Sequence, residues 1–150
     1  MPSGRIRRYS LWGVRGLLAL LFAASGVGKF IDAQNAVHLT RTILGGAVGP
    51  AEAQVLVVTV SGAEVVLSGL LVSGWWLQWI FGLSFGLVAG FTLGLATLLG
   101  GEGVATCGCF GAFGLGLSLE TTLLRNLVVL ALVLVGTLLS EMPDRRAVKT

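Results

Sequence analysis

The only two cysteines of this 150-residue chain, Cys107 and Cys109, are separated by a single glycine. Two cysteines at this spacing can form a disulfide in a small ring if the backbone bends sharply, and Gly108 permits backbone angles that other residues resist. Such a ring gains little stability from loop closure, because that contribution grows with the length of the loop. Strained disulfides are the labile and oxidising ones. The spacing therefore favours thiol exchange over structural bracing.

Two other interpretations of this pair remain open. Structural zinc usually takes four ligands, whereas the chain has two cysteines, one histidine and a few acids without ligand spacing, so we predict no metal site. Free cysteines can also serve as small hydrophobic residues. A pair within a glycine-rich segment, residues 100–116, is poorly placed for packing, so inert thiols are the weaker alternative.

Three ionisable residues lie inside apolar segments, where a charge costs on the order of 3 kcal/mol. They are Arg15, Glu64 and Arg125. At ~1.5 Å per helical residue, Glu64 and Arg15 lie at matching depths, ~18 Å and ~21 Å below the outer edge. Arg125 lies only ~10 Å below that edge, so its side chain would reach down to Glu64 or up to the loop. We predict a structural ion pair between Glu64 and Arg15, with Arg125 as the reserve partner and a proton relay as the alternative.

The groups named above must be positioned by four apolar segments. Hydrophobic residues make up 55% of the chain and charged residues 11%, a composition that excludes a soluble domain. Segments of about 20 apolar residues span a bilayer, and we predict such spans at residues 11–30, 51–73, 75–99 and 119–139. The first span also resembles a secretory signal peptide, but its arginine and the three later spans favour a retained anchor. We expect one all-α membrane domain over residues 1–150, a bundle of four transmembrane helices.

A short amphipathic helix is predicted between the first two spans, lying on the extracytoplasmic surface. Its polar residues recur at helical spacing and are Gln34, Asn35, His38, Arg41 and Thr42. His38 on this face is either a solvated surface histidine or a residue that steers the thiol chemistry.

Glycines recur at intervals of four along the third predicted span. They are Gly82, Gly86, Gly90 and Gly94. Stripes of small residues let helix backbones approach closely in lipid. We therefore predict that this stripe packs against another helix of the bundle and is not a ligand groove.

Positive charges predict the orientation in the membrane, because cytoplasmic segments retain Lys and Arg. These residues flank the first and last spans as Arg5, Arg7, Arg8, Arg145, Arg146 and Lys149. Both termini are thus expected in the cytoplasm of a plasma-membrane protein, with the Cys-Gly-Cys segment outside. Four tryptophans, Trp12, Trp75, Trp76 and Trp79, then fall at the cytoplasmic interface, which indole rings favour. The net charge of +3 is better explained by this topology and by contact with the lipid bilayer than by binding to nucleic acid.

The sequence resembles the MauE branch of the DoxX-like membrane proteins over nearly its whole length. The resemblance lies in residues 24–29 after Arg15, in Glu64 with Gly69, and in residues 107–111 followed by Arg125 and Asn126. MauE proteins are four-helix membrane proteins of methylamine utilisation. They are thought to help mature a disulfide-rich dehydrogenase subunit alongside a thioredoxin-like partner. The resemblance thus implies thiol/disulfide chemistry at the outer face.

The function we predict is a membrane thiol/disulfide oxidoreductase that acts through Cys107 and Cys109. Its partner would be a thioredoxin-like extracytoplasmic protein. We count Lys29 and His38 as modulators, because cations near a thiol favour the thiolate. Asn126 is counted with them because it is one of the residues that carry the resemblance. The alternative is a non-catalytic assembly or maturation factor whose cysteines brace the loop.

No cofactor follows directly from the sequence, although quinone is a candidate. Membrane disulfide enzymes that use quinone generally relay electrons through two cysteine pairs, and this chain has one. A relay here would be completed by a partner or reach quinone directly. A small-solute transporter is the third candidate and depends only on Glu64 and Arg15, because the helices show no clear inverted repeat.

Overall fold

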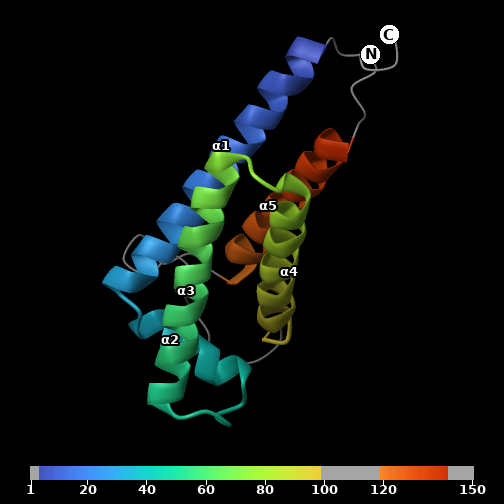
Figure 1. The fold of residues 1–150 in the computed structure, drawn as a ribbon. Helices are drawn as coiled ribbons and strands as arrows, with labels where there is room; N and C mark the ends of the chain where they lie inside the picture. Colours follow the sequence, from blue (N-terminus) through green and yellow to red (C-terminus); the bar gives the residue numbers. More distant parts are fainter. Residues whose placement is uncertain (1–3, 99–118, 142–150) are drawn as a thin grey trace.

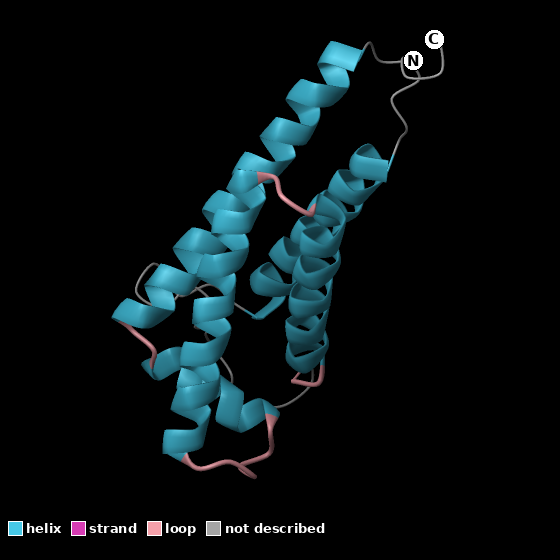
Figure 2. Cartoon of the chain, in the orientation of Figure 1, coloured by secondary structure: helices cyan, strands magenta, loops and turns pink. Residues whose placement is uncertain are grey.

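The structure is a computed structural model that describes residues 4–98 and 119–141, with side chains described for residues 8–98 and 120–140. The described residues form five helices and no strand (Figure 2). The helices are α1 (Gly4–Ile31), α2 (Gln34–Ile43), α3 (Pro50–Ser73), α4 (Leu77–Ala96) and α5 (Leu119–Glu141). All but α2 are long and apolar enough to cross a membrane. The predicted all-α bundle with four spans is confirmed.

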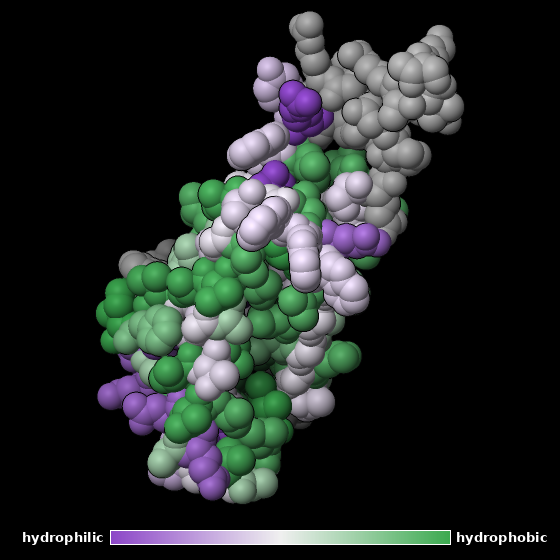
Figure 3. Space-filling model, viewed as in Figure 1, coloured by the Kyte–Doolittle hydropathy of each residue, from purple (hydrophilic) through white to green (hydrophobic). Residues whose placement is uncertain are grey.

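The four long helices are apolar on nearly all sides. Only 28% to 39% of the most apolar window of each helix is buried within the bundle, so the remaining side chains face outward. A helix that is apolar all round belongs in a core or in lipid. Figure 3 shows hydrophobic residues covering the middle of one face, with hydrophilic residues toward its two ends. This distribution is that of a multi-pass membrane protein.

The starts of two helices differ from the predicted spans, and for α4 the reason is backbone geometry. The helix α1 begins at Gly4 and so carries the basic residues before the first span. The helix α4 begins at Leu77 and not at Trp75, because Gly74 (φ 75°) ends α3 in a left-handed conformation and Trp76 (φ 52°) has a positive φ as well. Left-handed residues commonly end helices. The chain therefore reverses within residues 74–76.

The bundle is built from two helix pairs, α1 with α3 and α4 with α5, and α1 also contacts α5 (Figure 1). The antiparallel α1–α3 pair is joined by a hydrogen bond that the Ser68 hydroxyl donates to the Ala19 carbonyl at 2.7 Å. Gly26 makes the approach possible, since a Cβ there would lie 2.8 Å from the Ser61 carbonyl oxygen. In contrast, α3 and α4 make few contacts with each other. The bundle is therefore less tightly closed between α3 and α4.

The short helix α2 confirms the predicted amphipathic segment. Ala36 and Leu39 are buried, whereas His38 and Arg41 are exposed. Leu39 lies in a cluster to which Leu98 and Leu123 also contribute, together with Ile43, Phe91 and Leu95. The residues that precede and follow segment 99–118 are thus held at the α2 end of the bundle.

The prediction that the α4 glycine stripe packs closely against another helix is wrong. A Cβ at Gly82, Gly86 or Gly90 would meet no atom within 4 Å, and one at Gly94 would meet only Ile43 at 3.4 Å. Three of these glycines, at positions 86, 90 and 94, instead line an open groove of about 410 Å³ between α2, α3 and α4. Because α3 and α4 diverge, the missing side chains leave space.

Candidate functional site

A buried ion pair joins α1 to α3 in the interior of the bundle. The Lys29 ammonium donates to Glu64 Oε1 at 2.6 Å, and the two side chains are only 5% and 6% exposed. The ammonium also lies 5.6 Å from the centre of the Phe91 ring, within cation–π range. The predicted pairing of Glu64 with Arg15 is therefore wrong.

Arg15 has a different role at the other end of α3. Its Nε donates to the Leu71 carbonyl at 2.8 Å and its Nη2 to the Val72 carbonyl at 2.9 Å. The last carbonyls of a helix lack partners within it, and a cation is favoured there by the helix dipole. The guanidinium also lies 4.6 Å from the Trp12 ring centre. Arg15 thus completes the end of α3 instead of neutralising Glu64.

Side-chain direction explains why Lys29 and not Arg15 reaches Glu64. The contacts between Ala19 and Ser68 and between Gly26 and Ser61 put Glu64 level with a point on α1 between Arg15 and Lys29. Helical side chains tilt toward the N-terminus of their own helix. In an antiparallel pair this tilt brings Lys29 and Glu64 together and turns Arg15 away. Depth alone does not distinguish the two cations.

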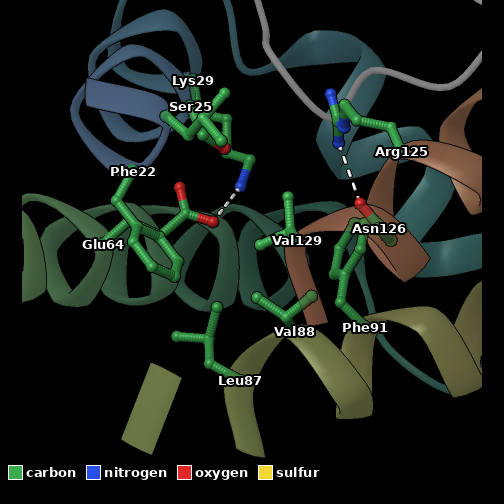
Figure 4. Close-up of a pocket in the computed structure, with 11 residues that line it drawn as sticks. Phe22, Ser25, Lys29, Glu64, Leu87, Val88, Phe91, Arg125, Asn126 and Val129 are labelled. Atoms are coloured by element: carbon green, nitrogen blue, oxygen red, sulfur yellow. Dashed lines mark hydrogen bonds and ion pairs between the residues drawn. The ribbon is translucent and has the colours of Figure 1, made fainter. Parts of the chain in front are cut away.

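Arg125 and Asn126 face the ion pair from α5 across a small cavity of about 60 Å³ (Figure 4). Asn126 is buried, and its Oδ1 accepts a hydrogen bond from Arg125 Nη2 at 3.1 Å. Lys29, Glu64 and Ser25 line the same cavity. The structure thus brings four of the predicted site residues together, although Arg125 does not take the place predicted for it as the reserve partner of Glu64.

The second carboxylate oxygen of Glu64 is a polar atom of this cavity without a donor among the described residues. Glu64 Oε2 is buried and accepts no hydrogen bond there. A buried carboxylate oxygen without a donor is costly, and a cavity of this size has room for water or a small polar group. Within residues 4–98 and 119–141, no group of three metal-ligating side chains is found. The arrangement is therefore suited to hydrogen bonding a small polar group, through one carboxylate oxygen and the Lys29 ammonium.

The predicted thiol pair, Cys107 and Cys109, lies outside the described residues, as does most of the predicted outer loop. His38, a predicted modulator, is exposed on the polar face of α2. Of the other two predicted modulators, Lys29 is committed to Glu64 and Asn126 to Arg125. Gly26 was not among the predicted site residues, although it lies in the segment 24–29 that carries the resemblance. A small residue one turn before Lys29 was the sequence signal for the close approach of α1 and α3.

Four membrane-length helices that enclose a buried ion pair define a multi-pass membrane protein with a polar cluster in its interior. Within that class, the chain belongs to the family described as methylamine utilisation protein MauE, whose model matches residues 7–139. The resemblance seen in the sequence is confirmed. No curated protein and no solved structure matches the chain.

Proposed function

We propose that this chain is a membrane thiol/disulfide oxidoreductase that exchanges disulfides through Cys107 and Cys109 with a thioredoxin-like extracytoplasmic protein. The observation that carries the proposal is the sequence Cys-Gly-Cys, the only cysteines of the chain, in a member of the MauE family. The family's description names methylamine utilisation. Thiol/disulfide chemistry in the maturation of a partner protein is what the resemblance of the sequence implies.

The packing around the segment supports the proposal indirectly. Leu98 and Leu123, on either side of residues 99–118, belong to one cluster with Leu39 of α2. The described residues on either side of the cysteine segment therefore pack together at one end of the bundle. A reactive pair needs a rigid scaffold on which a partner can dock.

The proposed reaction conserves atoms and electrons within two proteins. A thiolate of the partner attacks one sulfur of the Cys107–Cys109 disulfide, and the second sulfur leaves as a thiolate and takes up a proton. A second partner thiol then breaks the mixed disulfide. The partner ends as a disulfide and this chain as a dithiol, with two electrons and two protons transferred. The reverse sequence oxidises the chain.

The test is to trap the mixed disulfide in cells that produce the natural partner. In Cys107→Ser or Cys109→Ser, the remaining thiol can attack the disulfide of the oxidised partner, but the second thiol that would break the mixed disulfide is missing. A reducible band of higher mass should therefore appear. The double variant is the matched control and should give no such band. If both single variants and the double variant retain full activity in a complementation assay, the redox proposal is wrong. That result would favour the non-catalytic assembly factor.

A further inference from the structure

We propose that the groove between α2, α3 and α4 and the adjoining polar cavity form one binding site for a neutral, lipid-soluble molecule with a hydroxyl-bearing head, of the quinol type. The polar cavity would take the head and the groove the apolar body. This inference goes beyond thiol exchange, and neither Cys107 nor Cys109 takes part in it.

The two spaces adjoin because three residues, Lys29, Leu87 and Phe91, line both of them. The groove of about 410 Å³ falls within the range of about 300–1,000 Å³ that is typical of small-molecule sites. Apart from Lys29 and Thr40, its lining is apolar or glycine. At its rim, Leu44 and Leu56 are exposed, so an apolar molecule can enter from the surrounding lipid.

The hydrogen-bonding groups of the cavity specify the head. Glu64 Oε2 is an acceptor without a donor among the described residues, and it belongs to a side chain that is only 6% exposed. Lysine has three N–H donors, of which one is used by Glu64 Oε1. A hydroxyl group complements both atoms, since it can donate to Oε2 and accept from Lys29. The other polar residues of the lining, Ser25, Arg125 and Asn126, have partners of their own.

Depth in the membrane argues against an ordinary phospholipid. Glu64 lies ~21 Å along α3 from Pro50 and ~14 Å from Ser73, so the cavity is near the middle of the span. Charged head groups stay at the interfaces, because burial of a charge in hydrocarbon is costly. Quinols are neutral and oxygen-bearing, and an acylglycerol is the other membrane source of a neutral hydroxyl head. The aromatic rings of Phe22 and Phe91 in the cavity lining favour the quinol.

The α4 glycines supply a matched pair of variants. Gly90 lines the groove whereas Gly82 does not, and a Cβ at either position would meet nothing within 4 Å. Leucine at position 90 should therefore fill the groove without disturbing the fold, and leucine at position 82 should only add surface to lipid. The variants leave the Lys29–Glu64 pair untouched.

The experiment measures equilibrium binding of decylubiquinol, under anaerobic conditions, to the full chain in lipid nanodiscs. Wild type and Gly82→Leu should bind equally, whereas Gly90→Leu should bind at least ten-fold more weakly. Methylation of both ring hydroxyls should weaken binding to wild type by a similar factor, because no donor then remains for Glu64. Monoolein should compete poorly. The proposal is overturned if decylubiquinol does not bind, if Gly90→Leu binds as wild type does, if methylation has no effect, or if monoolein binds more tightly.

Discussion

At the scale of single residues, the Lys29–Glu64 pair is the feature with the largest energetic consequence. Two charges have been moved from water into the interior of a membrane bundle, where each would be strongly disfavoured alone. Their contact at 2.6 Å is the compensation. The pair therefore links the position of α1 to that of α3 more specifically than apolar packing can.

The first prediction concerns removal of one member of this pair. Lys29→Met should lower the free energy of unfolding by about 3–5 kcal/mol, because Glu64 is left buried without a cation. Combining Lys29→Met with Glu64→Leu should recover most of the loss, since no charge then remains. Unfolding in mixed micelles with increasing SDS compares both variants with the wild type.

The control uses the cation that the sequence suggested. Arg15 binds at Leu71, ~10 Å along α3 from Glu64, and effects of residues this far apart usually add to within about 0.5 kcal/mol. The effects of Arg15→Met and Glu64→Leu should therefore be additive. A strong coupling between these two, with none between Lys29 and Glu64, would contradict the structure.

The sequence located Arg15 and Glu64 as buried charges but missed Lys29, and so it paired Glu64 with the wrong cation. Hydropathy identifies a charge inside an apolar run, and both Arg15 and Glu64 are buried. The partner depends on which way each side chain points and on where α1 ends, and Lys29 belongs to the last turn of that helix. A rule of equal depth treats side chains as points on an axis, so it missed the converging tilt.

At the scale of helices, Gly26 sets the distance between α1 and α3. A Cβ at this position would lie 2.8 Å from both the Ser61 carbonyl oxygen and the Val65 side chain. The backbone oxygen cannot move aside without a shift of the helix. Gly26 lies one turn before Lys29, so the same close approach positions the ion pair.

The second prediction compares alanine at two glycines of α1. Gly16→Ala should stabilise the protein by roughly 0.5–1 kcal/mol, because alanine is the better helix former and nothing lies within 4 Å. Gly26→Ala should destabilise it, because overpacking typically costs about 1–3 kcal/mol and outweighs that gain. The SDS unfolding assay compares them. Equal effects at both positions would show that the α1–α3 approach is looser than described.

The existence of the helices was predictable, whereas their neighbours were not. Apolar runs and proline or glycine boundaries predicted all four spans and the amphipathic segment, because these signals are local. The spacing of the α4 glycines shows that they share one face but not what that face meets. Helices adjacent in the sequence need not pack closely, and α3 and α4 make few contacts.

At the scale of the whole molecule, one end of the bundle has the features of a membrane interface. Arg15 contacts both Trp12 and the end of α3, so Trp12 lies near the turn that carries Trp75 and Trp76. All three indole rings are exposed, by 57%, 79% and 75%. Exposed tryptophans gather at membrane interfaces. The α2 end, with its exposed polar face, is opposite.

The third prediction assigns sides to these two ends. Since the basic residues flank the tryptophan end, that end should be cytoplasmic and residues 99–118 extracytoplasmic. After mild reduction of intact cells, a membrane-impermeant maleimide should label Cys107 and Cys109. The double Cys→Ser variant is the control for background. Labelling only after lysis would mean that the orientation is reversed.

The most direct test of the central claim is the reduction potential of the Cys107–Cys109 pair. The purified chain is equilibrated with glutathione buffers of defined potential, and its free thiols are counted by mass-tagged alkylation. An exchanging pair should be half-reduced at a potential above about −300 mV, within reach of biological thiols. The fourth prediction is that outcome, with a single two-electron transition. A disulfide that resists reduction to well below about −300 mV, or a pair that never forms one, would contradict the account.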